Sequence, residues 1–140
     1  MSGTLISISN DDLRQVLQTQ VISSATTLSA ADSGKLFYLN AAAGAQITLP
    51  AVATSAGLNF RFSVQALFAT TAWTIVAATS VIQGGAIVNS VNVASANRNT
   101  ITFAHAADTI GDFVALNCDG VNWYVSGVGT TAAAITFTTV

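Results

Sequence analysis

The chain has 140 residues, enough for one domain with a substantial core that needs no disulfides. Only 7% of the residues are charged, against roughly a quarter in an ordinary soluble domain, and 51% are hydrophobic. The net charge of −2 and the scattered cations argue against nucleic acid as the main partner, because phosphate binding needs clustered Lys and Arg.

Several other classes of protein are disfavoured by simple patterns. No apolar run reaches the roughly 18 residues of a membrane span, and the N-terminus lacks the basic and apolar regions of a secretory signal. Cys118 is the only cysteine, which excludes an internal disulfide and fits a reducing cytoplasm. So few charges do not explain how the surface of a free monomer would stay soluble. We therefore expect a homo-oligomer or a subunit of a larger assembly.

Residues 1–27 are predicted to form an N-terminal arm or a short helix. Leu5, Ile6 and Ile8 fit a short strand. Residues 9–12 resemble a helix start, with a capping side chain and two acids near the positive end of the helix dipole. Apolar residues then follow at helical spacing: Leu13, Val16, Leu17 and Val21. Three alternatives stay open: this segment packs on its own domain, reaches a neighbouring subunit or is disordered.

From residue 28 onward the hydrophobic pattern changes to a period of two, which is typical of strands. Turn signals recur about every 8–12 residues, among them residues 32–34, 84–85 and 96–99. We therefore expect residues 28–140 to form a two-sheet, jelly-roll-like sandwich of about eight short antiparallel strands. The expected strands outside the C-terminal hairpin are residues 35–40, 45–49, 58–65, 73–77, 81–82, 86–93, 100–104 and 134–138.

The strongest local signal is the hairpin GDFVALNCDGVNWYVSG at residues 111–127. Asp119-Gly120 is typical of a two-residue type I′ turn, which would place Leu116 opposite Trp123. One side of the ribbon is then wholly apolar and holds Val114, Leu116, Cys118, Val121, Trp123 and Val125. Tyr124 lies on the other side, near Asn117 and Asn122.

No group of residues carries a recognisable catalytic or metal-binding pattern. His105, Asp108 and Asp112 are too few and too local for a metal site, and the two aspartates fit turns that bond their own backbone. There is no glutamate for paired-carboxylate chemistry and no G-x-S-x-G nucleophile motif. We therefore expect no enzyme activity, no metal and no cofactor.

Two segments resemble small structural proteins of tailed bacteriophages. Residues 111–127 are similar to a strand-turn-strand pattern, roughly G-D-x-V-x-L-x-x-D-G-x-N-W-x-V, found in head decoration (cement) proteins and in the distal domains of tail fibres. The segment LSAADSGKLFYLNAAAGAQITLP, residues 28–50, also resembles that group. The small size and the absence of a fibrous shaft favour the decoration type.

This resemblance implies a virion protein on the capsid exterior, made in the host cytoplasm, that bridges major capsid protein subunits as a dimer or trimer. Neither nucleic acid nor a membrane is an expected partner. The expected assembly interface consists of Leu5, Ile6, Ile8, Leu13, Val16, Leu17 and Tyr124. The alternative is a tail-fibre or receptor-binding module that recognises a host-surface saccharide through its loops or through Tyr124.

Overall fold

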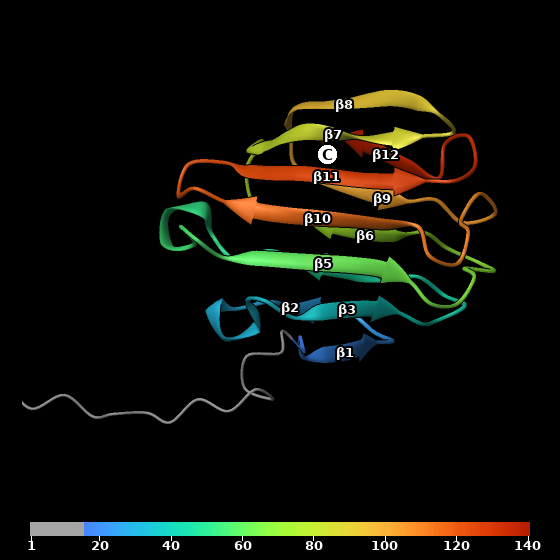
Figure 1. The fold of residues 1–140 in the computed structure, drawn as a ribbon, viewed down its shortest axis with the longest axis horizontal. Coiled ribbons are helices and arrows are strands. Elements are labelled where there is room, and N and C mark those ends of the chain that lie inside the picture. The colour runs from blue at the N-terminus through green and yellow to red at the C-terminus, as the bar shows by residue number, and fades with distance from the viewer. Residues whose placement is uncertain (1–15) are drawn as a thin grey trace, which may run out of the picture.

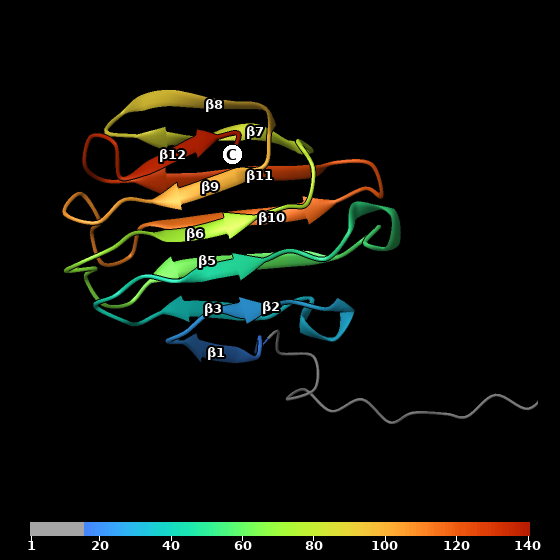
Figure 2. The ribbon, with the colours of Figure 1, turned by 180° about the vertical axis from the view of Figure 1, so that it is seen from behind.

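The chain forms a sandwich of two β-sheets in a computed structural model, which describes residues 16–140 (Figure 1). The large sheet has seven strands in the order β1-β3-β5-β10-β11-β7-β8, and the small sheet has five in the order β12-β9-β6-β4-β2. Figure 2 shows the small sheet from behind. The strands are β1 (Thr19–Ile22), β2 (Thr26–Thr27), β3 (Leu36–Leu39), β4 (Gln46–Thr48), β5 (Asn59–Val64), β6 (Trp73–Val76), β7 (Ile82–Val88), β8 (Val91–Arg98), β9 (Thr100–Phe103), β10 (Phe113–Cys118), β11 (Trp123–Gly129) and β12 (Ile135–Thr138), with 3-10 turns η1 (Ala30–Asp32) and η2 (Val52–Thr54). The predicted all-β sandwich is confirmed.

Strand pairing is mixed in both sheets. β1, β3 and β5 run parallel in the large sheet, as β2, β4 and β6 do in the small one, and β7 is parallel to β11. From β1 to β6 each successive strand lies in the other sheet, so neighbours within a sheet are two strands apart and run the same way. The expectation of purely antiparallel strands is therefore wrong, and the jelly-roll topology is not confirmed.

The N-terminal boundary also differs from the prediction. β1 pairs with β3 and β2 pairs with β4, so residues 19–27 belong to the sandwich and not to an arm. The helical spacing expected through Val21 is wrong at its C-terminal end, because Val21 lies in a strand and Ile22 is buried in the core. Pairing with β3 overrides the weak helical pattern of so short a segment.

The hairpin of β10 and β11 has a longer turn than expected. Leu116 pairs with Val125, not with Trp123, because residues 119–122 form a four-residue loop. Only Gly120 of the two expected turn residues has a positive φ, at 94°, whereas a type I′ turn needs two. The register moves by two residues, which leaves each strand residue on its predicted face.

A second hairpin lies where a single strand was expected, at residues 86–93. Asn89 and Ser90, with φ of 50° and 64°, make a tight turn between β7 and β8. The turn expected at residues 84–85 is instead inside β7. A Cβ on Gly84 would lie 2.3 Å from the Val125 carbonyl oxygen, so this glycine permits close strand packing.

The core between the sheets is aromatic. Phe37 and Phe62 stack with ring centroids 5.3 Å apart, and Phe60 lies 5.5 Å from Trp123. Trp123 and Cys118 are buried, as predicted. Val121, which was expected in the core, is exposed because it lies in the longer loop.

Candidate binding surfaces

In the polar cluster of His105, Asp108 and Asp112, the two aspartates hold loops together through hydrogen bonds. The Asp112 carboxylate is buried and accepts hydrogen bonds from the Thr130 backbone N–H at 2.9 Å, the Thr130 hydroxyl at 2.8 Å and the Thr109 N–H at 3.1 Å. Asp108 accepts from the Phe68 N–H at 2.6 Å, while His105 is exposed. The two aspartates thus join separate loops, beyond the local turn bonding expected of them. Residues 16–140 contain no group of three side chains that could hold a metal.

The tip of the β10–β11 hairpin is ordered by one carboxylate. Asp119 Oδ1 accepts the backbone N–H groups of Val121 at 2.8 Å and Asn122 at 2.7 Å, and Oδ2 accepts the Tyr124 hydroxyl at 3.0 Å. These bonds, that from Asn122 first, hold the pKa of Asp119 below its ordinary value. Tyr124 is exposed and pairs with Asn117, so the hairpin tip presents a tyrosine beside amide groups.

The outer face of the large sheet carries a continuous row of residues in register, which we call the apolar row. It runs across six strands through Val21, Tyr38, Ser63, Phe113, Val128 and Ile87. Val21, Val128 and Ile87 are 54%, 44% and 48% exposed. Five of the six are apolar or aromatic, and none is charged. Such a stripe across six of the seven strands differs from scattered single hydrophobic residues, which are normal on a protein surface.

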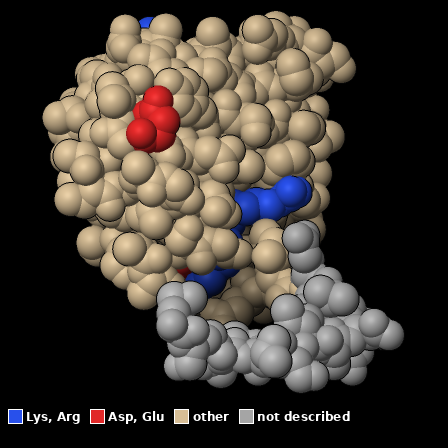
Figure 3. All heavy atoms as spheres, turned by 60° about the vertical axis from the view of Figure 1, so that its left-hand side comes forward, with Lys and Arg blue, Asp and Glu red and all other residues tan. Residues whose placement is uncertain are grey.

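One cation lies against the apolar row. The Arg61 guanidinium carbon is 4.0 Å from the centroid of the Phe113 ring, a cation–π geometry. Arg61 pairs with Ala115 and Leu36 in the neighbouring row, so both of its cross-strand neighbours are uncharged. Figure 3 shows, from one side, that most of the surface belongs to uncharged residues. The row is therefore uncharged along its length, and among residues 16–140 the Arg61 guanidinium packs on its Phe113 ring.

The outer face of the small sheet has a different chemistry and is here called the threonine face. Side chains alternate along its strands, so the rows that face away from the core are Thr136-Thr102-Thr74-Gln46 and Thr138-Thr100-Val76-Thr48-Thr27. Of these residues, Thr100 is itself buried. The intervening row, which contains Phe137, Ile101, Ile75 and Ile47, is buried. No residue in these two rows has a titratable side chain. A pocket of about 240 Å³ lies on this face beside Val140, and none of the side chains in its lining is an acid, a base or a thiol.

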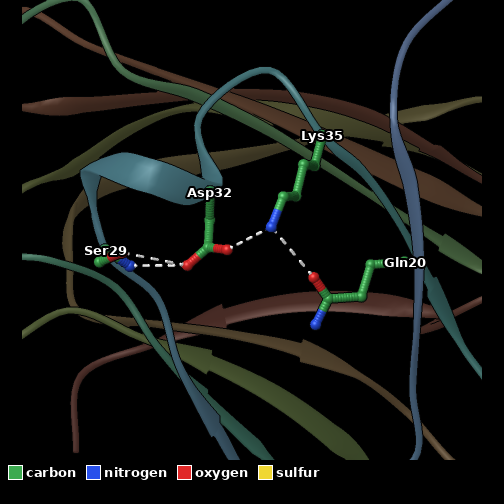
Figure 4. A network of polar contacts seen from close by, with 4 residues as sticks. All are labelled: Gln20, Ser29, Asp32 and Lys35. Carbon is green, nitrogen blue, oxygen red and sulfur yellow. Dashed lines mark hydrogen bonds and ion pairs between the residues drawn. The ribbon is translucent and has the colours of Figure 1, made fainter.

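Near β1 a small polar network fixes the start of the sandwich (Figure 4). Lys35 Nζ donates to Asp32 Oδ1 at 2.7 Å and to Gln20 Oε1 at 3.3 Å, and Asp32 Oδ2 accepts the Ser29 N–H at 3.0 Å. Lys35 is the main reason that the pKa of Asp32 is lowered. The network ties β1 to η1, and its partial exposure keeps its contribution to stability small.

The predicted interface residues are only partly placed. Leu5, Ile6, Ile8 and Leu13 lie outside the described residues. Val16, Leu17 and Tyr124 are exposed, and Tyr124 is far along the sheet order from β1. The apolar row was missed because it joins residues from six strands, although alternation within each strand already marks its members as outward-facing. Its detection needed the strand order, which the sequence does not contain.

Comparisons with protein-family models, with curated proteins and with solved structures give no match to this chain. Among residues 16–140, no helix has the length and apolar character needed to cross a membrane. The two outer faces and the hairpin tip are the surfaces through which the described residues can meet a partner.

Proposed function

We propose that the protein is a structural virion protein of the capsid decoration type, which binds the outside of a phage head and bridges major capsid protein subunits. The observation that carries this proposal is the apolar row, an uncharged stripe in register across six strands of a rigid sheet. A flat, preorganised apolar surface binds a partner with little loss of conformational entropy. Repeated over a shell, modest contacts of this kind stabilise the whole particle.

The described polar groups support a role in assembly. The carboxylates of Asp32, Asp108, Asp112 and Asp119 are engaged with backbone or side-chain donors of the sandwich itself. These contacts hold loops and turns in place, which favours a rigid building block. A jelly-roll relationship to decoration proteins belongs to this proposal and rests on the resemblance of residues 28–50 and 111–127.

The test is binding to purified heads that lack the protein. Wild-type protein is expected to coat the heads as a regular lattice visible by cryo-electron microscopy. Val128→Asp places a charge within the apolar row and should reduce occupancy at least tenfold, because the carboxylate must be desolvated on binding. Thr102→Asp puts the same charge on the threonine face and is the matched control, with occupancy expected to stay near wild type.

Two results would contradict the proposal. One is equal occupancy of wild type and Val128→Asp, with both proteins shown to be folded by circular dichroism. The other is a location restricted to a few copies at the tail. Deletion of residues 1–15 addresses the predicted contribution of Leu5, Ile6, Ile8 and Leu13, because it leaves β1 intact and should weaken head binding if those residues act as an arm.

The second candidate is a receptor-binding module for a host saccharide, favoured by the hairpin tip. Tyr124, Asp119 and Asn122 supply a ring, a carboxylate and an amide at the hairpin tip, the groups that sugar hydroxyls bond. Saccharide binding by the isolated protein, lost in Tyr124→Ala and kept in Thr102→Asp, would support this function. A decoration protein is expected to bind no saccharide in the same assay.

A further inference from the structure

Strand β8 forms one open end of the large sheet (Figure 1). It spans eight residues, whereas the edge strands β1, β2 and β12 have four, two and four. Val88 and Val91 flank the two-residue turn and bond each other, so Asn92 and Ala94 direct their N–H and C=O groups away from β7. Among residues 16–140, no loop or strand donates to or accepts from this outer edge.

The edge lacks the usual protection against pairing. Natural edge strands carry lysines, prolines or bulges that block the approach of another strand. Residues 91–95 contain no charge and no proline, and the pairing irregularity with β7 lies beyond them, toward Arg98. Val91, on the side of the small sheet, is 61% exposed. The outer edge of β8 therefore offers unpaired backbone N–H and C=O groups beside an apolar side chain. The partner that fits such an edge is another strand.

We propose that β8 pairs antiparallel with β8 of a second copy of this chain, joining two large sheets across a twofold axis. The outward groups of Asn92 meet those of Ala94 in the partner, which places the axis at Val93 and makes the register self-consistent. The two Val93 side chains then face each other across the axis. An isologous contact of this kind needs only the one edge that each subunit already exposes.

Charge decides between antiparallel and parallel pairing. Arg98 is the only charged residue of β8. In the antiparallel arrangement the two Arg98 residues lie at opposite ends, about 30 Å apart at ~3.3 Å per residue. A parallel arrangement would place them about 5 Å apart on adjacent strands, where like charges repel.

The experiment measures the mass of the full chain by sedimentation equilibrium. Wild type is expected at twice the subunit mass of 14.2 kDa. Ala94→Lys and Ala94→Asp each place two like charges on diagonal positions across the axis and should weaken dimerisation at least tenfold. An equimolar mixture of the two variants should restore the dimer as a heterodimer, because the diagonal charges then attract. Thr74→Lys, on the central strand β6, is the matched control and should remain dimeric.

A wild-type monomer at high protein concentration would overturn the proposal. Dimers of unchanged affinity in both Ala94 variants would overturn it as well. If either charged variant fails to fold, Ala94→Pro serves instead, because it removes an outward N–H and keeps the β7 ladder. The proposal is independent of the virion assignment, since a protein that dimerises through β8 but does not coat heads would keep this inference and lose the proposed function.

Discussion

The outer faces of the two sheets differ sharply, although their inner faces are alike. Both inner faces are apolar, with Phe37 and Phe62 in the large sheet and Ile101 and Phe103 in the small one. Outside, the large sheet has the apolar row beside two mixed rows that include Arg61, Ser126 and Tyr124, and the small sheet has the threonine face. The same period-two alternation therefore produces two surfaces with different affinities for partners.

The difference shows how a chain with few charges divides its surface. Threonine has the β-branched shape that strands favour, and its hydroxyl keeps the face hydrated without charge. The apolar row has no such hydroxyls apart from those of Tyr38 and Ser63, so covering it releases more water from apolar surface. The apolar row is thus suited to contact and the threonine face to solvent, within a single sandwich.

Residues of the apolar row should contribute much less to stability than residues of the core between the sheets. Phe62 is fully buried and stacked on Phe37, so Phe62→Ala should lower the free energy of unfolding by about 4 kcal/mol. Phe113, on the outer face, is half-buried beneath Arg61, and Phe113→Ala should cost only about 1 kcal/mol. Urea denaturation of both variants measures the difference. Equal losses would mean that the row is buried in the folded chain.

Exchanging valine and threonine between the two outer faces should affect head binding on one face only. Val128→Thr gives the apolar row one residue of the threonine face, and should weaken binding to heads about fivefold, since about 1 kcal/mol of apolar burial is lost. Thr102→Val makes the opposite change and should leave head binding unaltered. Both variants should unfold within about 0.5 kcal/mol of wild type, as surface substitutions usually do. A gain of head binding by Thr102→Val would show that both faces make contact.

The sequence predicts part of this picture for clear reasons. Alternation is local, so it places Trp123 and Cys118 inside and Tyr124 outside, and all three assignments are confirmed. The Asp119 turn signal identified a hairpin but not its loop length, because the Asp119 carboxylate caps two N–H groups in a longer loop instead of occupying a type I′ turn.

Strand order lies beyond such local signals. The alternation of β1 to β6 between sheets creates parallel pairs with no turn residue to mark them. Without that order, Phe113, Val128 and Ile87 are three separate outward residues, and nothing in their spacing along the chain shows that they touch the same row. The candidate surface therefore depends on long-range pairing, which the fold alone reveals.

The contact between Arg61 and the Phe113 ring should make a small contribution to stability. Arg61→Ala should lower the free energy of unfolding by about 0.5–1 kcal/mol, because the guanidinium no longer packs on the Phe113 ring. A double-mutant cycle with Phe113→Ala isolates this contact from other effects of either change. Full additivity of the two substitutions would show that the ring and the cation are not coupled.

The smallest expected effect separates the two faces by pH. Asp119, at the hairpin tip that continues the outer side of the large sheet, has a pKa lowered from 3.8 by hydrogen bonds from Asn122 and Val121, whereas the threonine face has no titratable side chain. A carboxyl with a lowered pKa in the folded state stabilises fully above 3.8, and this stabilisation is lost as the pH falls through the folded-state value. Asp119→Asn keeps an acceptor oxygen but removes the charge, so its stability deficit against wild type should be constant between pH 7 and about 5 and should shrink below pH 3.8. Urea denaturation across this range measures the gap, and Thr102→Val, whose difference from wild type should not change with pH, is the control. A gap that is independent of pH for Asp119→Asn would mean that the loop is held by the shape of its turn and not by the ionised carboxylate.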